Sequence, residues 1–206
     1  MFVELLDKLR CLNTHEDSPL VVTTAVTVAR HIREGMLGCP VCHAEYLIHD
    51  GVVDFGGSVP VPSLGPEFFT SDRTTKIAAM LALDARGGVF VLDWLSSLFT
   101  SDLLNYSEDS QFIAISGYDE VNGAGAILRS DTIPLARGSI RGIVLDRSDT
   151  KMMRSAVAAL APGGRLVAPS DAAEPDGISV LARDDEYWVG ERELSPEVST
   201  LRRAPS

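Results

Sequence analysis

Three cysteines and one histidine are the residues whose types and spacing predict chemistry. Cys39 and Cys42 are separated by two residues in a Cys-Pro-Val-Cys turn, and the only other cysteine of the chain is Cys11, with His15 four positions after it. Thiolates and a neutral imidazole are ligands that zinc prefers, and three cysteines with one histidine form a closed structural site. The spacing therefore predicts a structural zinc site made of Cys11, His15, Cys39 and Cys42.

Two alternatives to this assignment stay open. The Cys-x-x-Cys turn could be a redox pair, with Cys11 a buried free thiol. A redox pair of this type normally opens a helix after a strand, whereas here a strand-like alternation through Tyr46 and Ile48 follows, which favours zinc. The fourth ligand is less determined than the three thiolates, because His43 and His31 are rivals.

The elements that must position these ligands form a small unit. The sequence predicts a short amphipathic helix and three strands rich in Val, Thr and Ile. About 55 residues bury too little apolar area to be secure without a metal. The expected elements are a helix over 2–9 and strands over 20–30, 31–37 and 46–55.

The order of these features resembles a known zinc ribbon. GMLGCPVC at 35–42 and YLIHDGV at 46–52 are similar to the small activator subunits that bind and stabilise methyltransferases acting on tRNA, rRNA and release factors. The resemblance covers residues 1–56. It implies a small antiparallel sheet with a zinc site, and pairing with a partner through a sheet edge. The departure is His15, where many relatives carry a second upstream cysteine.

A Gly- and Pro-rich segment divides the chain. We expect a zinc-ribbon domain over 1–56, a linker over 57–66, a second domain over 67–194 and a tail over 195–206. Helical and strand-like runs alternate in the second domain, which predicts an α/β fold with a mostly parallel sheet and a closing antiparallel hairpin. The expected helices are 70–83, 95–106 and 151–160, and the expected strands are 89–94, 112–116, 124–128, 140–145, 165–168, 178–183 and 186–192.

The second domain resembles the class I S-adenosylmethionine-dependent methyltransferases over about residues 68–192. The resemblance rests on IPLARGSIRGIV at 133–144, a following helix, and LAPGGRLV at 160–167. It implies a truncated Rossmann-like sheet, and a cofactor loop after the first strand in which an acid is followed by glycines at alternate positions. Asp93 matches the acid.

The glycine positions of that loop do not match. They fall on Leu95, Ser97 and Phe99, which resist positive φ and, at Leu95 and Phe99, fill space that the cofactor would need. Trp94 is interpreted as a packing residue. The loop therefore argues against binding of S-adenosylmethionine.

Other acids of the family pattern survive in outline. Asp119, or its neighbour Glu120, fits the acid that holds the ribose hydroxyls, and Asp131 fits the acid near the adenine. The segment between Gly117 and Asp131 is too short for a strand and the usual helix. No catalytic constellation is evident, and two acids after the fourth strand are interpreted as cap and solvent-facing groups, Asp146 and Asp149.

Charge and hydropathy limit the partners. A net charge of -11 and a pI near 4.7 argue against direct binding of nucleic acid, which needs a basic face. No signal peptide and no apolar run of about 18 residues is evident. Together with reduced zinc-ligand cysteines, these features predict a cytoplasmic protein without a membrane span.

These observations favour a zinc-binding, methyltransferase-like pseudoenzyme that acts as a protein-binding, scaffold or regulatory subunit. The segment 20–28 would offer a sheet edge to a protein partner or to another copy of the chain. The alternative is an active methyltransferase with a divergent cofactor loop. A third hypothesis is an unrelated ligand-binding α/β domain, or a zinc module that reads another macromolecule.

Overall fold

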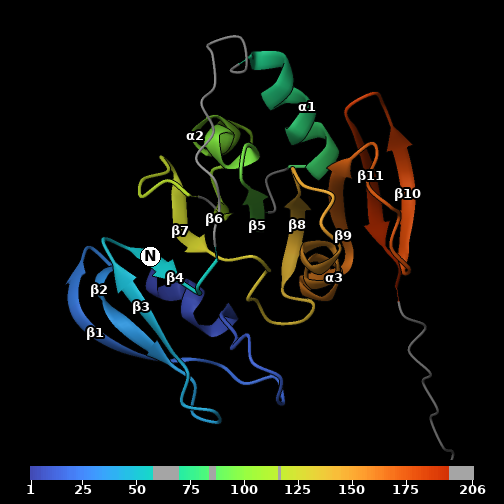
Figure 1. Ribbon diagram of the computed structural model, residues 1–206. Coiled ribbons are helices and arrows are strands. Elements are labelled where there is room, and N and C mark those ends of the chain that lie inside the picture. Colours follow the sequence, from blue (N-terminus) through green and yellow to red (C-terminus); the bar gives the residue numbers. More distant parts are fainter. Residues whose placement is uncertain (58–69, 84–86, 116, 195–206) are drawn as a thin grey trace, which may run out of the picture.

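The computed structural model describes residues 1–57, 70–83, 87–115 and 117–194. The predicted linker beyond Gly57 and the predicted tail lie outside the described residues. The described strands form one continuous sheet of eleven strands, in the order β1-β2-β3-β4-β7-β6-β5-β8-β9-β11-β10 (Figure 1). The chain is thus mixed α/β, as predicted, with a large sheet and few helices.

The first part of the chain contributes four antiparallel strands at one end of the sheet (Figure 1). The expected helix is a 3-10 helix, and the expected strand over 46–55 is a hairpin of two strands. Asp50 and Gly51, with φ of 49° and 85°, form the two-residue turn, because positive φ at both positions matches the strand twist. The elements are η1 (Val3–Lys8), β1 (Val21–Val28), β2 (His31–Gly38), β3 (Glu45–His49) and β4 (Val52–Asp54).

The second part contributes a mostly parallel sheet closed by a hairpin. Counted from β5, its first five strands lie in the order 3-2-1-4-5, which is the order of the doubly wound α/β sheet. The final hairpin adds β11 antiparallel to β9, as expected. The strands are β5 (Gly88–Asp93), β6 (Ser110–Ile115), β7 (Ala124–Arg129), β8 (Ile140–Val144), β9 (Leu160–Pro169), β10 (Ile178–Arg183) and β11 (Tyr187–Arg192).

The helices differ from expectation at one place. The helices α1 (Ser71–Leu81) and α3 (Thr150–Ala159) confirm two predictions. The segment 95–106 is instead a series of short turns, with the single-turn α2 (Thr100–Leu103) between the 3-10 helices η3 (Ser96–Phe99) and η4 (Leu104–Tyr106). Serine and threonine hydroxyls there bond to backbone carbonyls three residues earlier, which competes with a regular helix.

The two parts of the chain join through a parallel strand pair. β4 pairs with β7 in the register Val52↔Ile127, Val53↔Leu128 and Asp54↔Arg129. The strands before residue 57 are predicted to form a sheet of their own, but β4 extends the sheet formed by β5–β11. One outer edge of the combined sheet is β1, which corresponds to the predicted edge segment, and the other is β10.

Helices cover the two faces of the central sheet unequally. Apolar side chains of α1, including Ile77 and Leu81, pack on Phe90 and Phe112 on one face. On the other face α3 and η1 pack on a larger core that continues into the N-terminal strands β1–β4, and α1 and α3 lie on opposite sides of β8 and β9 (Figure 1). None of the helices within the described ranges has the length and apolar character needed to cross a membrane.

Candidate functional site

The four predicted metal ligands come together beside the knuckle turn. One ligand atom from each of Cys11, His15, Cys39 and Cys42 lies within 4.8 Å of the others. The Cys11 and Cys42 sulfurs are 3.5 Å apart, and the Cys39 sulfur is 3.4 Å from His15 Nε2. Tetrahedral zinc with bonds of about 2.0–2.3 Å separates its ligand atoms by roughly 3.5–3.8 Å. The donor set and its spacing therefore fit one tetrahedral ion.

The backbone of the knuckle explains why two thiols reach one point. Cys39 N–H donates to the Ala44 carbonyl at 2.9 Å, and His43 N–H donates to the Cys39 carbonyl at 3.0 Å. His43 takes φ of 59° to close this turn, and His31 stacks on the Phe2 ring with centroids 3.8 Å apart. Neither rival histidine belongs to the four-residue group, which leaves His15 as its imidazole.

Neighbouring polar groups orient the ligands. His15 Nδ1 lies 2.6 Å from the Glu16 carbonyl, so a proton on Nδ1 leaves Nε2 free for a metal. Asn13 Nδ2 donates to the Cys42 sulfur at 3.3 Å. A hydrogen bond from the Ala44 backbone, with this amide, lowers the pKa of Cys42 to about 6. The Glu16 backbone bond raises the pKa of His15, so these groups favour the Cys42 thiolate, and a bound metal would displace a proton from the imidazole.

Tyr46 supports the upstream half of the group. Its hydroxyl accepts from Leu12 N–H and lies 3.2 Å from the Cys11 sulfur. Burial raises the pKa of Tyr46 to about 12, so the phenol keeps its proton and donates to sulfur. Sequence reasoning placed Tyr46 only in a strand alternation. Tyr46 and Asn13 are residues that it missed.

A second polar network occupies the carboxyl ends of β5 and β8, where the strand order reverses and doubly wound sheets bind ligands. Asp93, at the end of β5, is fully buried. The guanidinium of Arg147 engages both of its oxygens, with Nη2–Oδ1 at 2.6 Å and Nε–Oδ2 at 3.0 Å. The predicted cofactor acid is thus paired to a cation of the same chain.

Arg147 is surrounded by acids. Burial acts to lower the pKa of Arg147, but the Asp93 hydrogen bond and the charges of Asp93, Asp131 and Asp149 outweigh burial and raise it. Asp149 also caps α3 by accepting from Met152 N–H at 2.8 Å, which confirms its predicted role. The charges of these three acids therefore all act on one guanidinium.

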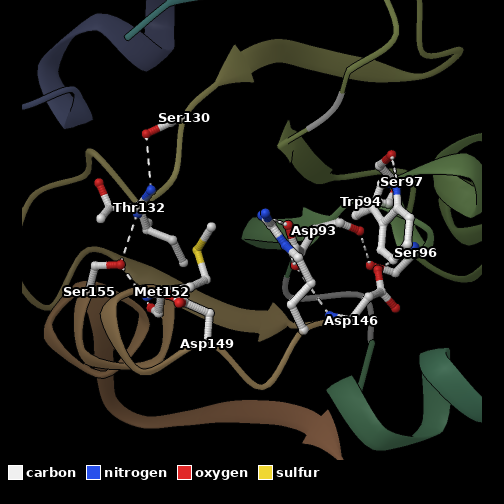
Figure 2. A network of polar contacts seen from close by, with 12 residues as sticks. Asp93, Trp94, Ser96, Ser97, Ser130, Thr132, Asp146, Asp149, Met152 and Ser155 are labelled. Carbon is white, nitrogen blue, oxygen red and sulfur yellow. Dashed lines mark hydrogen bonds and ion pairs between the residues drawn. The ribbon is translucent and has the colours of Figure 1, made fainter. Parts of the chain in front are cut away.

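Asp146 was expected to be a cap or a solvent-facing group, and this expectation is wrong. Its Oδ2 accepts from Ser96 N–H at 2.7 Å, and its Oδ1 accepts from the Tyr187 hydroxyl at 3.4 Å. Figure 2 shows Asp146 between Asp93 and the turn that carries Ser96. Burial, followed by the charge of Asp93, raises the pKa of Asp146 to about 7.

The predicted cofactor loop forms a 3-10 turn. Leu95 is right-handed helical with φ of -71° and ψ of -41°, and Phe99 has φ of -92°. Ser97 and Phe99 are buried, and Phe99 packs with Leu103 in the core under α1. Positive φ occurs one residue earlier, at Trp94, with φ of 24°. The side chains at the glycine positions therefore shape a compact turn.

Trp94 is a packing residue, and Asp119 lies away from the Asp93 network. Trp94 packs against the larger core, as predicted, and its buried Nε1 has no hydrogen-bond partner within the described residues. Asp119 is exposed and forms an ion pair with Arg129, in a cavity that also includes His49 and Leu47 of the ribbon. Asp119 thus faces the ribbon strands and pairs with a different cation from Asp93.

Comparisons with known proteins give distant likenesses. No family model matches the chain, and no curated protein matches it. A precorrin-6Y C5,15-methyltransferase from Geobacter metallireducens is 11% identical with a TM-score of 0.46, over 66% of this chain and 100% of that one. The N-methyltransferase NodS from Bradyrhizobium japonicum is 18% identical with a TM-score of 0.38, over 60% and 96%.

A dehydrogenase is similar at the same level. A cinnamyl alcohol dehydrogenase from Sorghum bicolor is 17% identical with a TM-score of 0.42, over 77% of this chain and 54% of that one. Identities and TM-scores this low are too weak to assign an activity. The chemistry of the chain must be argued from its own residues.

Proposed function

We propose that this chain is a zinc-stabilised, methyltransferase-like pseudoenzyme that serves as a protein-binding or scaffold subunit. The observation that carries the proposal is the pairing of Asp93 with Arg147. The carboxylate that would face the cationic amino-acid end of S-adenosylmethionine already has both oxygens bound to a guanidinium. A cofactor would have to displace this ion pair from a fully buried carboxylate, which is costly.

The turn after β5 supports the same proposal. A cofactor loop needs backbone that approaches the ligand closely, which glycine allows. Here buried side chains occupy those positions, with Phe99 in the core. The residues present do not fit the amino-acid end of the cofactor, and we derive no methyl transfer through it.

The ribbon supports a binding role. Its β4 edge is taken by β7 of the same chain, whereas β1 keeps an outer edge of eight residues without a charge. Val21 and Val28 on this strand are 61% and 58% exposed. Natural sheet edges usually carry charges that prevent pairing. We propose that β1 adds a strand from a protein partner or from another copy of the chain.

The cofactor test is a calorimetric titration of the zinc-loaded chain with S-adenosylmethionine. We expect no saturable heat at millimolar cofactor. The matched variant is Arg147→Gln, which frees Asp93 and is expected to gain weak binding if Arg147 is the group that blocks the crevice. Micromolar binding by the unchanged protein would refute the pseudoenzyme assignment.

The partner test uses the exposed edge. Val21→Lys and Val28→Lys place charges on β1 without touching the core, with Thr75→Lys on α1 as a control on another surface. Sedimentation measures self-association, and cross-linking mass spectrometry of the purified complex measures a separate partner. We expect the two β1 variants to lose the association that the control keeps. An association that all three variants retain would exclude this edge.

Asp146 favours a second candidate, an active methyltransferase with a divergent loop. Its pKa of about 7 would allow a carboxylate at the end of β8 to accept a proton near neutral pH. The cofactor titration separates the two functions, because an active enzyme must bind the cofactor. If it does, Asp146→Asn should abolish turnover while leaving cofactor affinity unchanged.

A further inference from the structure

A cavity of about 310 Å³ lies between the ribbon and the second domain. Arg10, Cys11 and His15 line it from the ribbon side, and Thr132, Arg137 and Ser155 line it from the other. Backbone bonds fix the two walls, since Arg10 N–H donates to Pro134 and Ala136 N–H donates to Lys8 at 2.7 Å. The cavity is separate from the Asp93 network, and pockets at domain junctions are common ligand sites.

Thr132 lines this cavity, and its hydroxyl is an unpartnered polar group. The residue is 8% exposed, and within the described residues its Oγ1 has no hydrogen-bond partner. Its backbone N–H is satisfied by Ser130 Oγ at 3.2 Å. Figure 2 shows the Thr132 side chain pointing away from Ser155. A buried hydroxyl without a partner is unfavourable, and a bound group that accepts its proton would remove that cost.

The charges at the cavity favour an anion. Arg10 Nε lies 2.9 Å from Asp17 Oδ1, and its Nη1 donates to the carbonyls of Asp7 and Leu9. Asp17, which also lines the cavity, is therefore paired with Arg10, and Arg10 is held as part of the wall. Arg137 has no ion pair or hydrogen bond among the residues that the structure describes, and it is exposed enough to move. A guanidinium of this kind is suited to bidentate binding of carboxylate or phosphate.

Apart from Asp17, the rest of the lining is apolar. Ile133, Leu135 and Ala158 face the same space, so a ligand with one charged end and a short hydrocarbon part would cover them. We propose that this cavity binds a small anion, a carboxylate or a phosphate ester, through the Thr132 hydroxyl and the Arg137 guanidinium. This site goes beyond the proposed binding function and does not depend on whether S-adenosylmethionine binds.

The position of the site has a consequence for the metal centre. Cys11 and His15 belong to both the cavity lining and the metal group. A ligand that bridges Arg137 and Thr132 to the ribbon wall holds the two domains together at the metal. Ligand occupancy should therefore slow the loss of zinc to a chelator.

The test is a titration of the zinc-loaded full chain with inorganic phosphate and with propionate, followed by amide shifts in NMR spectra. We expect saturable shifts at residues 132–137 and 10–15. Arg137→Gln and Thr132→Val should each weaken binding by about tenfold or more. The controls are Arg154→Gln, an exposed arginine on α3 outside the cavity, and Thr27→Val on β1.

The outcomes distinguish the two kinds of ligand and show whether the cavity binds an anion at all. Tighter binding of phosphate indicates a phosphate ester, and tighter binding of propionate indicates a carboxylate. Arg137→Gln alters an exposed side chain and is expected to fold. It therefore tests anion binding even if Thr132→Val does not fold. The proposal is overturned if neither probe gives saturable shifts at the cavity, or if Arg137→Gln binds as tightly as Arg154→Gln.

Discussion

Replacing Arg147 with glutamine tests how the buried Asp93 is neutralised. Asp93 is fully buried and Arg147 is 23% exposed by side chain. Removing one partner of a buried pair costs about 3–5 kcal/mol, because the remaining charge has no compensation. Partial exposure of Arg147 lets water reach the vacated position, so we expect the lower end, about 3 kcal/mol.

A double-mutant cycle isolates the pair. Asp93→Asn leaves Arg147 charged but able to reach water, so we expect a smaller loss of about 1–2 kcal/mol. The double variant Asp93→Asn/Arg147→Gln should be more stable than the sum of the single losses predicts, by about 1.5 kcal/mol. Urea unfolding of the zinc-loaded chain, monitored by tryptophan fluorescence, gives these free energies.

Two results would refute this reasoning. The first is an Arg147→Gln protein within about 0.5 kcal/mol of the unchanged chain, since Asp93 would then be neutralised by another group. The second is strict additivity in the cycle, since the two side chains would then not interact.

Three further predictions concern other parts of the molecule. Cys39→Ser should prevent zinc binding, which contributes on the order of 10 kcal/mol to the folding free energy of small zinc domains. Hydrogen-exchange protection over residues 1–56 should then fall, and native protection there would contradict a structural metal. The pKa of Asp146 rises from 3.8 to about 7 on folding, so the folded chain binds a proton that the unfolded chain has lost in this interval. The unfolding free energy should therefore fall as pH rises from about 4 to about 7. Asp146→Asn should flatten this pH dependence in urea unfolding at several pH values, and an unchanged slope would exclude Asp146 as its source. A Cβ at Gly35 would lie 2.5 Å from the Thr23 carbonyl oxygen, so Gly35→Ala should cost about 1–3 kcal/mol and increase hydrogen exchange in β1, whereas unaltered exchange would show that β1 adjusts freely.

The metal group was predictable because its signal is local. Cys39 and Cys42 are fixed by a four-residue turn, and the composition leaves few other ligands to complete the set. The orienting groups were not predictable, since the Tyr46 hydroxyl reaches Cys11 across 35 positions. Spacing in the sequence can indicate ligands, but it cannot indicate the hydrogen bonds that orient them.

The strands show the same division between local and distant signals. Alternation and turn residues predicted most strands of the second domain and the closing hairpin. The alternation predicts one strand over 46–55, which the Asp50-Gly51 turn divides into β3 and β4. The pairing of β4 with β7 depends on the assembled sheet. So does the pair of Arg147 and Asp93, which are 54 positions apart in the sequence. Short-range patterns carry no information on either.

The β4–β7 pair also affects how a newly synthesised chain avoids aggregation. β7 carries unpaired backbone groups along a largely apolar strand until β4 covers it, and such edges recruit strands of other chains. β4 lies in the same N-terminal segment as the Cys11, His15, Cys39 and Cys42 group. If a metal stabilises this segment, as we propose, its loss would uncover the β7 edge and favour aggregation of the chain.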